Sequence, residues 1–207
     1  MAIQIDEQSK ENVKKILSGL DKETKIMFFE GENCKTCPDV KELVSVVEKL
    51  SDGKLKVEYH DLKDDVAKKM NVDKAPAIVI DNIRYYGIPS GHEFGPFVEM
   101  IVFASKGENI LQQSTIEKIK KVNKPVRIQV FITPTCPYCP KAVIISHMLA
   151  IANKNITSDM VEAIEFPEES QKYGVMAVPK IVINETTSFE GAYPEDAFAE
   201  QVLKAIE

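Results

Sequence analysis

A chain of 207 residues is long enough for one large domain or for two small ones, each with its own core. Its net charge of −6 argues against a nucleic-acid partner, because no excess of cations is available to neutralise phosphates. No apolar run approaches the roughly 18 residues that a membrane-spanning helix needs. The polar N-terminus also lacks the apolar core of a signal peptide, so we expect a cytoplasmic protein without a membrane partner.

Apolar spacing predicts the elements of the first half. Apolar residues recur every three or four positions in the predicted helices and alternate or cluster in the predicted strands. Asp81 and Asn82 separate two short strands as a hairpin turn would. The predicted order is a helix over 13–20, a strand over 25–29, a helix over 40–50, strands over 55–60, 77–80 and 83–86, and a helix over 94–102.

The stretch from Ala104 to Gln113 is the best candidate for a linker. It divides the chain into predicted domains over 1–112 and 113–207. A helix over 114–122 would open the second domain, with Ser114 as its cap and Glu117 completing a capping box. The elements predicted after it are strands over 127–132 and within 156–164, strands over 179–183 and 188–190, and helices over 137–151 and 194–206.

The four cysteines form two pairs with the same spacing, Cys34-Lys35-Thr36-Cys37 and Cys136-Pro137-Tyr138-Cys139. Each pair follows a predicted strand and precedes a predicted helix. Pro76 and Pro179 open equivalent strands further along each half, allowing for a slip of one residue. The halves are therefore two copies of one fold. We predict an α/β protein in which each copy has a central mixed sheet flanked by helices.

Close cysteine pairs in a protein that is not exported indicate redox or metal chemistry rather than a structural framework. A thiolate is the species that attacks a disulfide, and a helix N-terminus stabilises such an anion. Cys136 is therefore predicted as the exposed nucleophile and Cys139 as the shielded resolving thiol, and Cys34 and Cys37 are predicted to take the same roles at the first pair. Pro137 is predicted at the first position of its helix, where proline is favoured.

Several of these features resemble the glutaredoxin and thioredoxin superfamily: the run Cys-Pro-Tyr-Cys after an apolar strand, Val178-Pro179 ahead of a strand, and Gly191. Two such halves, both with intact pairs, resemble the archaeal-type protein disulfide oxidoreductases over essentially the whole chain. The resemblance implies two tandem thioredoxin-like domains. It also implies cis peptide bonds before Pro76 and Pro179. The substrate-binding residues that we expect on this basis are Ala75, Pro76, Val178, Pro179, Pro137 and Tyr138.

The function implied by the resemblance is thiol–disulfide exchange on protein substrates, covering reduction, oxidation and isomerisation. It implies no bound cofactor and a supply of electrons from NADPH through a thioredoxin reductase-like flavoprotein. The alternative is an electron carrier, similar to the paired domains at the head of flavin-dependent peroxiredoxin reductases. A metal-bridged protein is a third hypothesis. It is disfavoured because 98 residues separate Cys37 from Cys136, whereas zinc ribbons use roughly 15–20.

The sequence also departs from the thioredoxin pattern. The buried carboxylate that thioredoxins carry six residues before the nucleophile is absent, and Phe28 and Val130 stand there. Glu30 is the nearest candidate for proton transfer at the first pair. We expect His147 to be a packing or solvated residue, and the acidic stretches 61–65 and 165–169 to be solvated surface.

Overall fold

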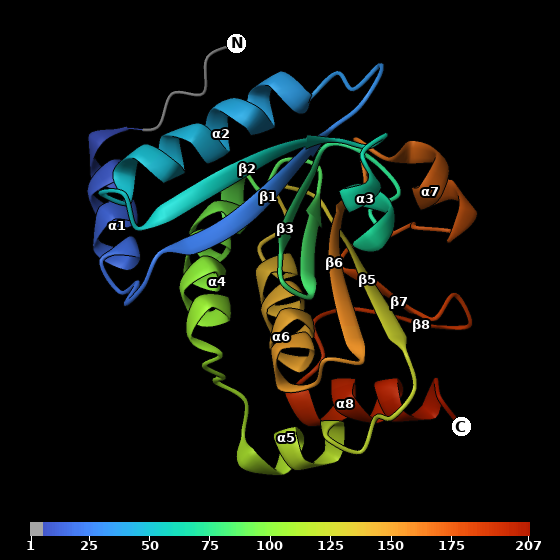
Figure 1. The fold of residues 1–207 in the computed structure, drawn as a ribbon. Helices are drawn as coiled ribbons and strands as arrows, with labels where there is room; N and C mark the ends of the chain where they lie inside the picture. Colours follow the sequence, from blue (N-terminus) through green and yellow to red (C-terminus); the bar gives the residue numbers. More distant parts are fainter. Residues whose placement is uncertain (1–5) are drawn as a thin grey trace.

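A computed structural model describes residues 6–207, and each half contains the same succession of α-helices and strands (Figure 1). The first half comprises α1 (Glu7–Leu17), β1 (Thr24–Glu30), α2 (Cys37–Leu50), β2 (Leu55–Asp61), α3 (Asp65–Lys69), β3 (Ala77–Ile80), β4 (Ile83–Tyr86), the 3-10 helix η1 (Gly91–Glu93) and α4 (Phe94–Lys106). The second half comprises α5 (Gln113–Ile119), β5 (Val126–Ile132), α6 (Cys139–Ala152), β6 (Ile156–Glu162), α7 (Pro167–Lys172), β7 (Lys180–Ile183), β8 (Thr187–Glu190) and α8 (Glu195–Lys204). The predicted repeat is therefore confirmed.

The two halves share one mixed sheet of eight strands, in the order β2-β1-β3-β4-β6-β5-β7-β8. The halves join where β4 runs parallel to β6, with Ile83 opposite Ser158 and Tyr86 opposite Val161. Figure 1 shows the strands of both halves side by side, with helices on both faces. The sequence predicted a mixed sheet in each half, but no sequence pattern predicted the pairing of β4 with β6.

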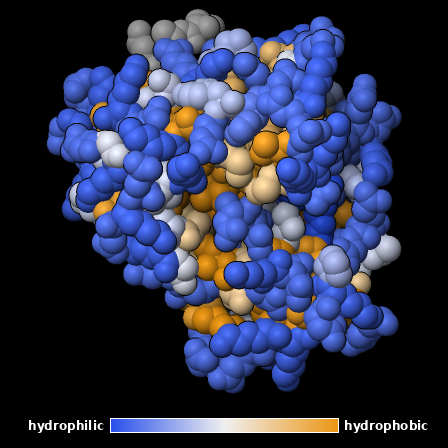
Figure 2. All heavy atoms as spheres, in the orientation of Figure 1, coloured by the Kyte–Doolittle hydropathy of each residue, from blue (hydrophilic) through white to orange (hydrophobic). Residues whose placement is uncertain are grey.

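Hydrophobic cores lie on both faces of the sheet. Successive side chains of a strand point to opposite faces, so Phe28 and Tyr85 enter the larger core while Phe29 and Tyr86 enter the smaller one. The larger core packs against α1, α2, α4, α6 and α8, and the smaller one lies by α3 and α7. Hydrophilic side chains cover most of the face in Figure 2, and hydrophobic ones emerge in its middle.

The start of α5 differs from the prediction. Gln112 is its N-cap residue, so capping by Ser114 is wrong. Glu195 of α8 instead accepts hydrogen bonds from the backbone N–H of Gln112 at 2.7 Å and from the Thr115 hydroxyl at 2.9 Å. A carboxylate from a distant helix thus accepts from the N-cap N–H and from a side chain of the first turn. The loop between α4 and α5 falls within the predicted linker, and a domain boundary after residue 112 stays a prediction.

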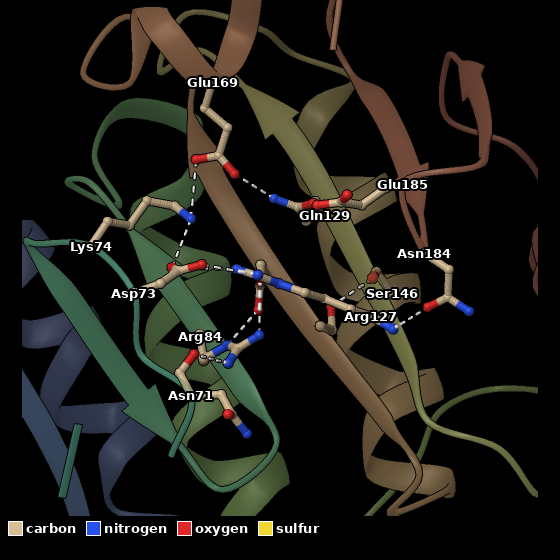
Figure 3. Close-up of polar contacts among 12 residues, drawn as sticks. Asn71, Asp73, Lys74, Arg84, Arg127, Gln129, Ser146, Glu169, Asn184 and Glu185 are labelled. Atoms are coloured by element: carbon tan, nitrogen blue, oxygen red, sulfur yellow. Dashed lines mark hydrogen bonds and ion pairs between the residues drawn. The ribbon is translucent and has the colours of Figure 1, made fainter. Parts of the chain in front are cut away.

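A buried ion pair joins the halves where β4 meets β6 (Figure 3). Arg84 of β4 donates to both carboxylate oxygens of Asp159 on β6, at 2.6 and 3.1 Å. Arg127 of β5 donates to the same carboxylate at 2.7 Å. Nη1 of Arg84 also donates to the carbonyls of Asn71 and Met70, at 2.8 and 3.3 Å. The buried charges are thus paired and hydrogen-bonded, as burial requires.

The charged network continues towards the first cysteine pair. Arg127 also donates to Asp73 at 3.0 Å, and the Lys74 ammonium lies 2.9 Å from Asp73 and 3.0 Å from Glu169 of α7 (Figure 3). Although burial opposes it, the hydrogen bond from Arg127 and the charge of Lys74 hold the pKa of Asp73 well below its ordinary value. Charged groups of the second half therefore hold the segment that directly precedes Pro76.

Over residues 6–207, no helix combines the length and the apolar character that crossing a membrane requires.

Replacing Asp159 with Asn should strongly destabilise the fold, because two arginine side chains would lose their buried counter-charge. We expect a loss of about 3–5 kcal/mol, measured by urea unfolding. Glu58→Gln is the matched control, since it breaks an exposed pair with Lys25 and should leave the midpoint almost unchanged. Equal midpoints for Asp159→Asn and the control would contradict a structural role for the buried pair.

Candidate active sites

Each cysteine pair lies between a strand and the helix that follows it. Cys34 and Cys37 connect β1 to α2, Cys136 and Cys139 connect β5 to α6, and both pairs form disulfides, with Cα atoms 5.4 and 5.5 Å apart. β1 and β5 run in the same direction, so both pairs lie at the same end of the strands. Four strand spacings of about 4.8 Å separate β1 from β5, which places the strand ends roughly 19 Å apart.

The second pair adjoins the first turn of α6. The N–H of Cys139 points at Sγ of Cys136, with nitrogen and sulfur 3.1 Å apart. Unpaired N–H groups and the helix dipole both favour negative charge on that sulfur. The helix begins at Cys139, so the prediction that Pro137 occupies its first position is wrong, and Pro140 is the proline of the first turn. The residues before Cys139 form a turn that brings its N–H onto the sulfur.

The two cysteines of each pair differ in exposure. Cys136 is 8% exposed and Cys139 is 0% exposed, while Cys34 is partly exposed and Cys37 is buried. The first cysteine of each pair is therefore the more accessible, although Cys136 is more covered than we predicted. This order suits an attacking first thiol and a shielded second thiol, and these roles stay proposals.

A cis-proline segment lies beside each pair. The Ala75–Pro76 and Val178–Pro179 peptide bonds are both cis, as the resemblance implied. The carbonyl oxygen of Val178 is 3.8 Å from Sγ of Cys136. Ala75 and Pro76 line the same hollow as Cys34. The backbone of each segment thus borders the sulfur that a substrate would meet.

The second pair has an exposed apolar rim. Tyr138, between the two cysteines, is 71% exposed, and Pro137 beside it is also exposed. Met176, two residues before Val178, is another exposed hydrophobic side chain. Pro137 and Tyr138 offer a substrate chain apolar surface in the same loop as Cys136, and Met176 adds exposed apolar surface close in sequence to the cis-proline segment.

The first pair instead borders a hollow of about 480 Å³ that both halves build. The first half contributes residues 33–36 together with Ala75 and Pro76, and the second half contributes residues 164–167. Sequence reasoning missed the second wall. This wall depends on the pairing of β4 with β6, which brings the segment after β6 next to the first pair. No sequence motif predicts that pairing.

The acidic stretch 165–169 is not simply solvated surface, so that prediction is wrong. Glu165 accepts a hydrogen bond from the hydroxyl of Thr36, between the first two cysteines. Glu169 accepts one from Gln129 of β5 at 2.6 Å and pairs with Lys74. These carboxylates are held by polar groups that other elements supply.

The position of the usual thioredoxin carboxylate is filled by hydrocarbon in both halves, because Phe28 and Val130 are fully buried. Glu30, the candidate from sequence, lies partly exposed with its carboxylate 3.0 Å from the Lys41 ammonium. Glu162, at the end of β6, is a buried carboxyl whose pKa is raised by burial. One of its oxygens accepts from the N–H of Glu165 at 2.7 Å.

Further buried polar groups lie between β4, η1 and α6. His147 is fully buried, its Nδ1 is 2.7 Å from the Ser158 hydroxyl, and burial lowers its pKa to about 3, which agrees with a packing role. Its ring contacts Tyr85, with centroids 4.9 Å apart. Glu93 of η1 is 1% exposed, neither carboxylate oxygen has a hydrogen-bond partner among the described residues, and burial raises its pKa to about 7. The preceding residue, His92, donates its N–H to Pro134, in the turn before Cys136.

Within residues 6–207, no group of three or more His, Cys, Asp or Glu side chains is placed to hold a metal ion. The four cysteines are bonded within their own pairs rather than gathered at one centre. The structure therefore provides no support for the zinc hypothesis.

Comparison with known proteins agrees with this geometry. The family model of the thioredoxin domain matches the chain twice, over residues 22–99 and 126–204. The crystal structure of a protein disulfide oxidoreductase from Aeropyrum pernix superposes with a TM-score of 0.88 and 32% identity, covering 97% of this chain and 93% of that one.

A second group of similar proteins consists of alkyl hydroperoxide reductases. One such reductase from Staphylococcus aureus is 36% identical over 102 residues, which is 49% of this chain but only 20% of that protein. The structure of the alkylhydroperoxide reductase AhpF from Enterococcus faecalis covers 96% of this chain and 99% of that one. Its TM-score of 0.87 at 23% identity shows a shared fold.

Glu93 should make stability fall as pH rises. The folded protein holds its proton more tightly than the unfolded chain, so the favourable contribution is complete below about pH 4.5 and is lost as pH rises to about 7. A shift of this size corresponds to about 3 kcal/mol. Urea unfolding across this pH range should show a smaller decline for Glu93→Gln than for the original chain. Glu11→Gln, at an exposed position, should not alter the decline. If the free energy of unfolding declined equally with pH in Glu93→Gln and in the original chain, the raised pKa of Glu93 would be contradicted.

Proposed function

The chain belongs to the thioredoxin domain family and, within it, to the two-domain protein disulfide oxidoreductases, and we propose that it reduces, oxidises and isomerises disulfides of protein substrates. The observation that carries this proposal is the N–H of Cys139 aimed at Sγ of Cys136, beside the cis-proline segment at Val178. This arrangement stabilises an attacking thiolate next to backbone that an extended substrate chain can contact.

Reduction at the second pair proceeds in two exchanges. The Cys136 thiolate attacks one sulfur of a substrate disulfide, forming a mixed disulfide and releasing the other substrate sulfur as a thiolate. The Cys139 thiolate then attacks Sγ of Cys136, which restores the enzyme disulfide and frees the second substrate thiol. Two electrons pass from the enzyme to the substrate. Oxidation is the reverse sequence, and isomerisation ends without net electron transfer.

The surroundings of the pairs support different substrate preferences. The exposed rim at Tyr138 and Met176 suits flexible chains with apolar residues next to a cysteine. The first pair lies in the hollow built by both halves, so it accepts a narrower range of partners. Electrons for reduction would come from NADPH through a thioredoxin reductase-like flavoprotein.

The second candidate function is an electron carrier that passes reducing equivalents from such a flavoprotein to peroxiredoxin-type acceptors. The observation that favours it is the 36% identity over 102 residues to the alkyl hydroperoxide reductase from Staphylococcus aureus. The two functions differ in one measurable respect. A carrier needs no isomerase activity, whereas the leading proposal requires reactivation of a protein whose disulfides have been scrambled.

The proposal predicts that each pair can be trapped on a protein substrate. Cys139→Ala should accumulate a mixed disulfide at Cys136, because the resolving sulfur is missing, and Cys37→Ala should do so at Cys34. Non-reducing electrophoresis followed by peptide mass spectrometry would detect the adducts. Cys136→Ser is the matched control, which should form no adduct at the second pair. Absence of trapped substrate from both resolving variants would contradict the proposal.

Reactivation of a protein whose disulfides have been scrambled distinguishes an isomerase from an electron carrier. Variants that keep only one pair, made by Cys34→Ser with Cys37→Ser or by Cys136→Ser with Cys139→Ser, should each reactivate more slowly than the intact chain. If the pairs cooperate, the intact chain will exceed the sum of the two variants, and simple addition would rule cooperation out. Reduction potentials measured for each pair add a second criterion, since about −270 mV marks a reductant and about −180 mV an oxidant or isomerase.

A further inference from the structure

Glu165 belongs to the second half of the chain but lies at the cysteine pair of the first half. One carboxylate oxygen accepts a hydrogen bond from the hydroxyl of Thr36, which stands between Cys34 and Cys37. The other oxygen accepts from the N–H of Ile88 at 2.7 Å. A carboxylate from the loop after β6 is therefore held against the first pair by two donors of the first half.

The surrounding backbone is shaped around this carboxylate. Gly87, at the end of β4, has a φ of +90°, and a side chain there would place its Cβ 2.6 Å from Cβ of Glu162 and 2.8 Å from Oε1 of Glu165. Only glycine leaves room for both acidic side chains at this point. Glu165 also lines the hollow that contains Cys34. Its charge therefore faces the same space as the sulfur that a substrate would meet.

The second pair has a different environment at the equivalent position. Tyr138 takes the place of Thr36 and projects into solvent. In the sheet, β4 of the first half pairs with β6, whereas β8, its counterpart in the second half, is an edge strand. The loop after β6 supplies a carboxylate from the second half to the first pair, whereas the first half meets the turn before Cys136 through the backbone N–H of His92. The pairs are thus made electrostatically unequal by the junction between the halves.

We propose that Glu165 is a positioning residue of the first pair, which fixes Thr36 and disfavours the thiolate of Cys34. A negative charge beside a thiolate opposes its formation, and destabilising the thiolate also destabilises the reduced pair. The first pair is consequently held as the stronger reductant and the slower nucleophile. The division of roles between the two pairs follows from a residue outside both cysteine motifs.

Other charged groups belong to the segments around the first pair. Lys35 adjoins it in the same loop, and Asp39 lies in the first turn of α2. Lys74 precedes the cis-proline segment, with its ammonium held by Asp73 and Glu169. The buried carboxyl of Glu162 accepts a hydrogen bond from the backbone N–H of Glu165. Since these groups act together, the contribution of Glu165 must be measured as a difference between variants.

The test is Glu165→Gln in the intact chain, which keeps the shape of the side chain and removes its charge. The fully reduced protein is alkylated with iodoacetamide over a pH series, and the peptides of Cys34 and Cys136 are quantified by mass spectrometry. We expect the Cys34 profile to move to lower pH, with roughly three- to tenfold faster alkylation below its midpoint. The glutathione equilibrium of the first pair should move towards the dithiol at a pH where Cys34 is ionised. The Cys136 profile should not move.

Two further variants separate charge from packing. Glu168→Gln removes an exposed carboxylate of the same acidic stretch and should leave both profiles unchanged. Thr36→Val removes the hydroxyl but keeps the carboxylate, so its Cys34 profile should move less than that of Glu165→Gln. An unchanged Cys34 profile in Glu165→Gln would overturn the proposal. Equal movement of the Cys34 and Cys136 profiles would also overturn it, because a general loosening of the fold would then explain the result.

This inference rests on the proposed exchange chemistry, but its readout does not require a substrate. A shifted Cys34 profile in a protein without exchange activity would refute the proposed function alone. An unshifted profile in a protein that exchanges disulfides would refute the role of Glu165 alone.

Discussion

The parallel pairing of β4 with β6 is the constraint on which the rest of the molecule depends. It turns two small sheets into one and brings Arg84 opposite Asp159 at the centre of the protein. A buried charge pair is costly unless its geometry and hydrogen bonds are nearly complete, and here Arg127 and two backbone carbonyls complete them. The junction therefore fixes how the halves meet, since a slip of one residue would leave these charges without partners.

The same junction decides the surroundings of the redox sites. Because β1 and β5 run in one direction, both cysteine pairs lie at the same end of the sheet. The loop after β6 then forms a wall for the first pair, and the network from Arg127 through Asp73 holds Lys74 ahead of its cis proline. The second pair keeps an open apolar rim instead. Two copies of one fold thus acquire unequal sites because each copy has a different neighbour.

Buried polar groups show a second kind of constraint. Glu93, Glu162 and His147 are enclosed although burial disfavours their charged forms, and burial shifts the pKa of each towards the neutral state. Glu162 accepts a hydrogen bond from the N–H of Glu165. Glu93 directly follows His92, whose N–H donates to Pro134 in the turn before Cys136. Buried ionisable groups are therefore part of the interior of both halves, although Phe28 and Val130 are hydrocarbon.

The sequence by itself determined the repeat, the order of strands and helices, the two redox pairs and the prolines at 76 and 179. These features rest on local spacing and on internal comparison of the halves, which a single chain contains in full. It placed the start of α6 wrongly at Pro137 and the cap of α5 wrongly at Ser114, since a sulfur and a distant carboxylate take up the N–H groups there. Only the tertiary structure decided that Glu165 lies at the first pair. Thr36 and Glu165 are 129 residues apart, and their contact depends on a strand pairing that no local pattern encodes.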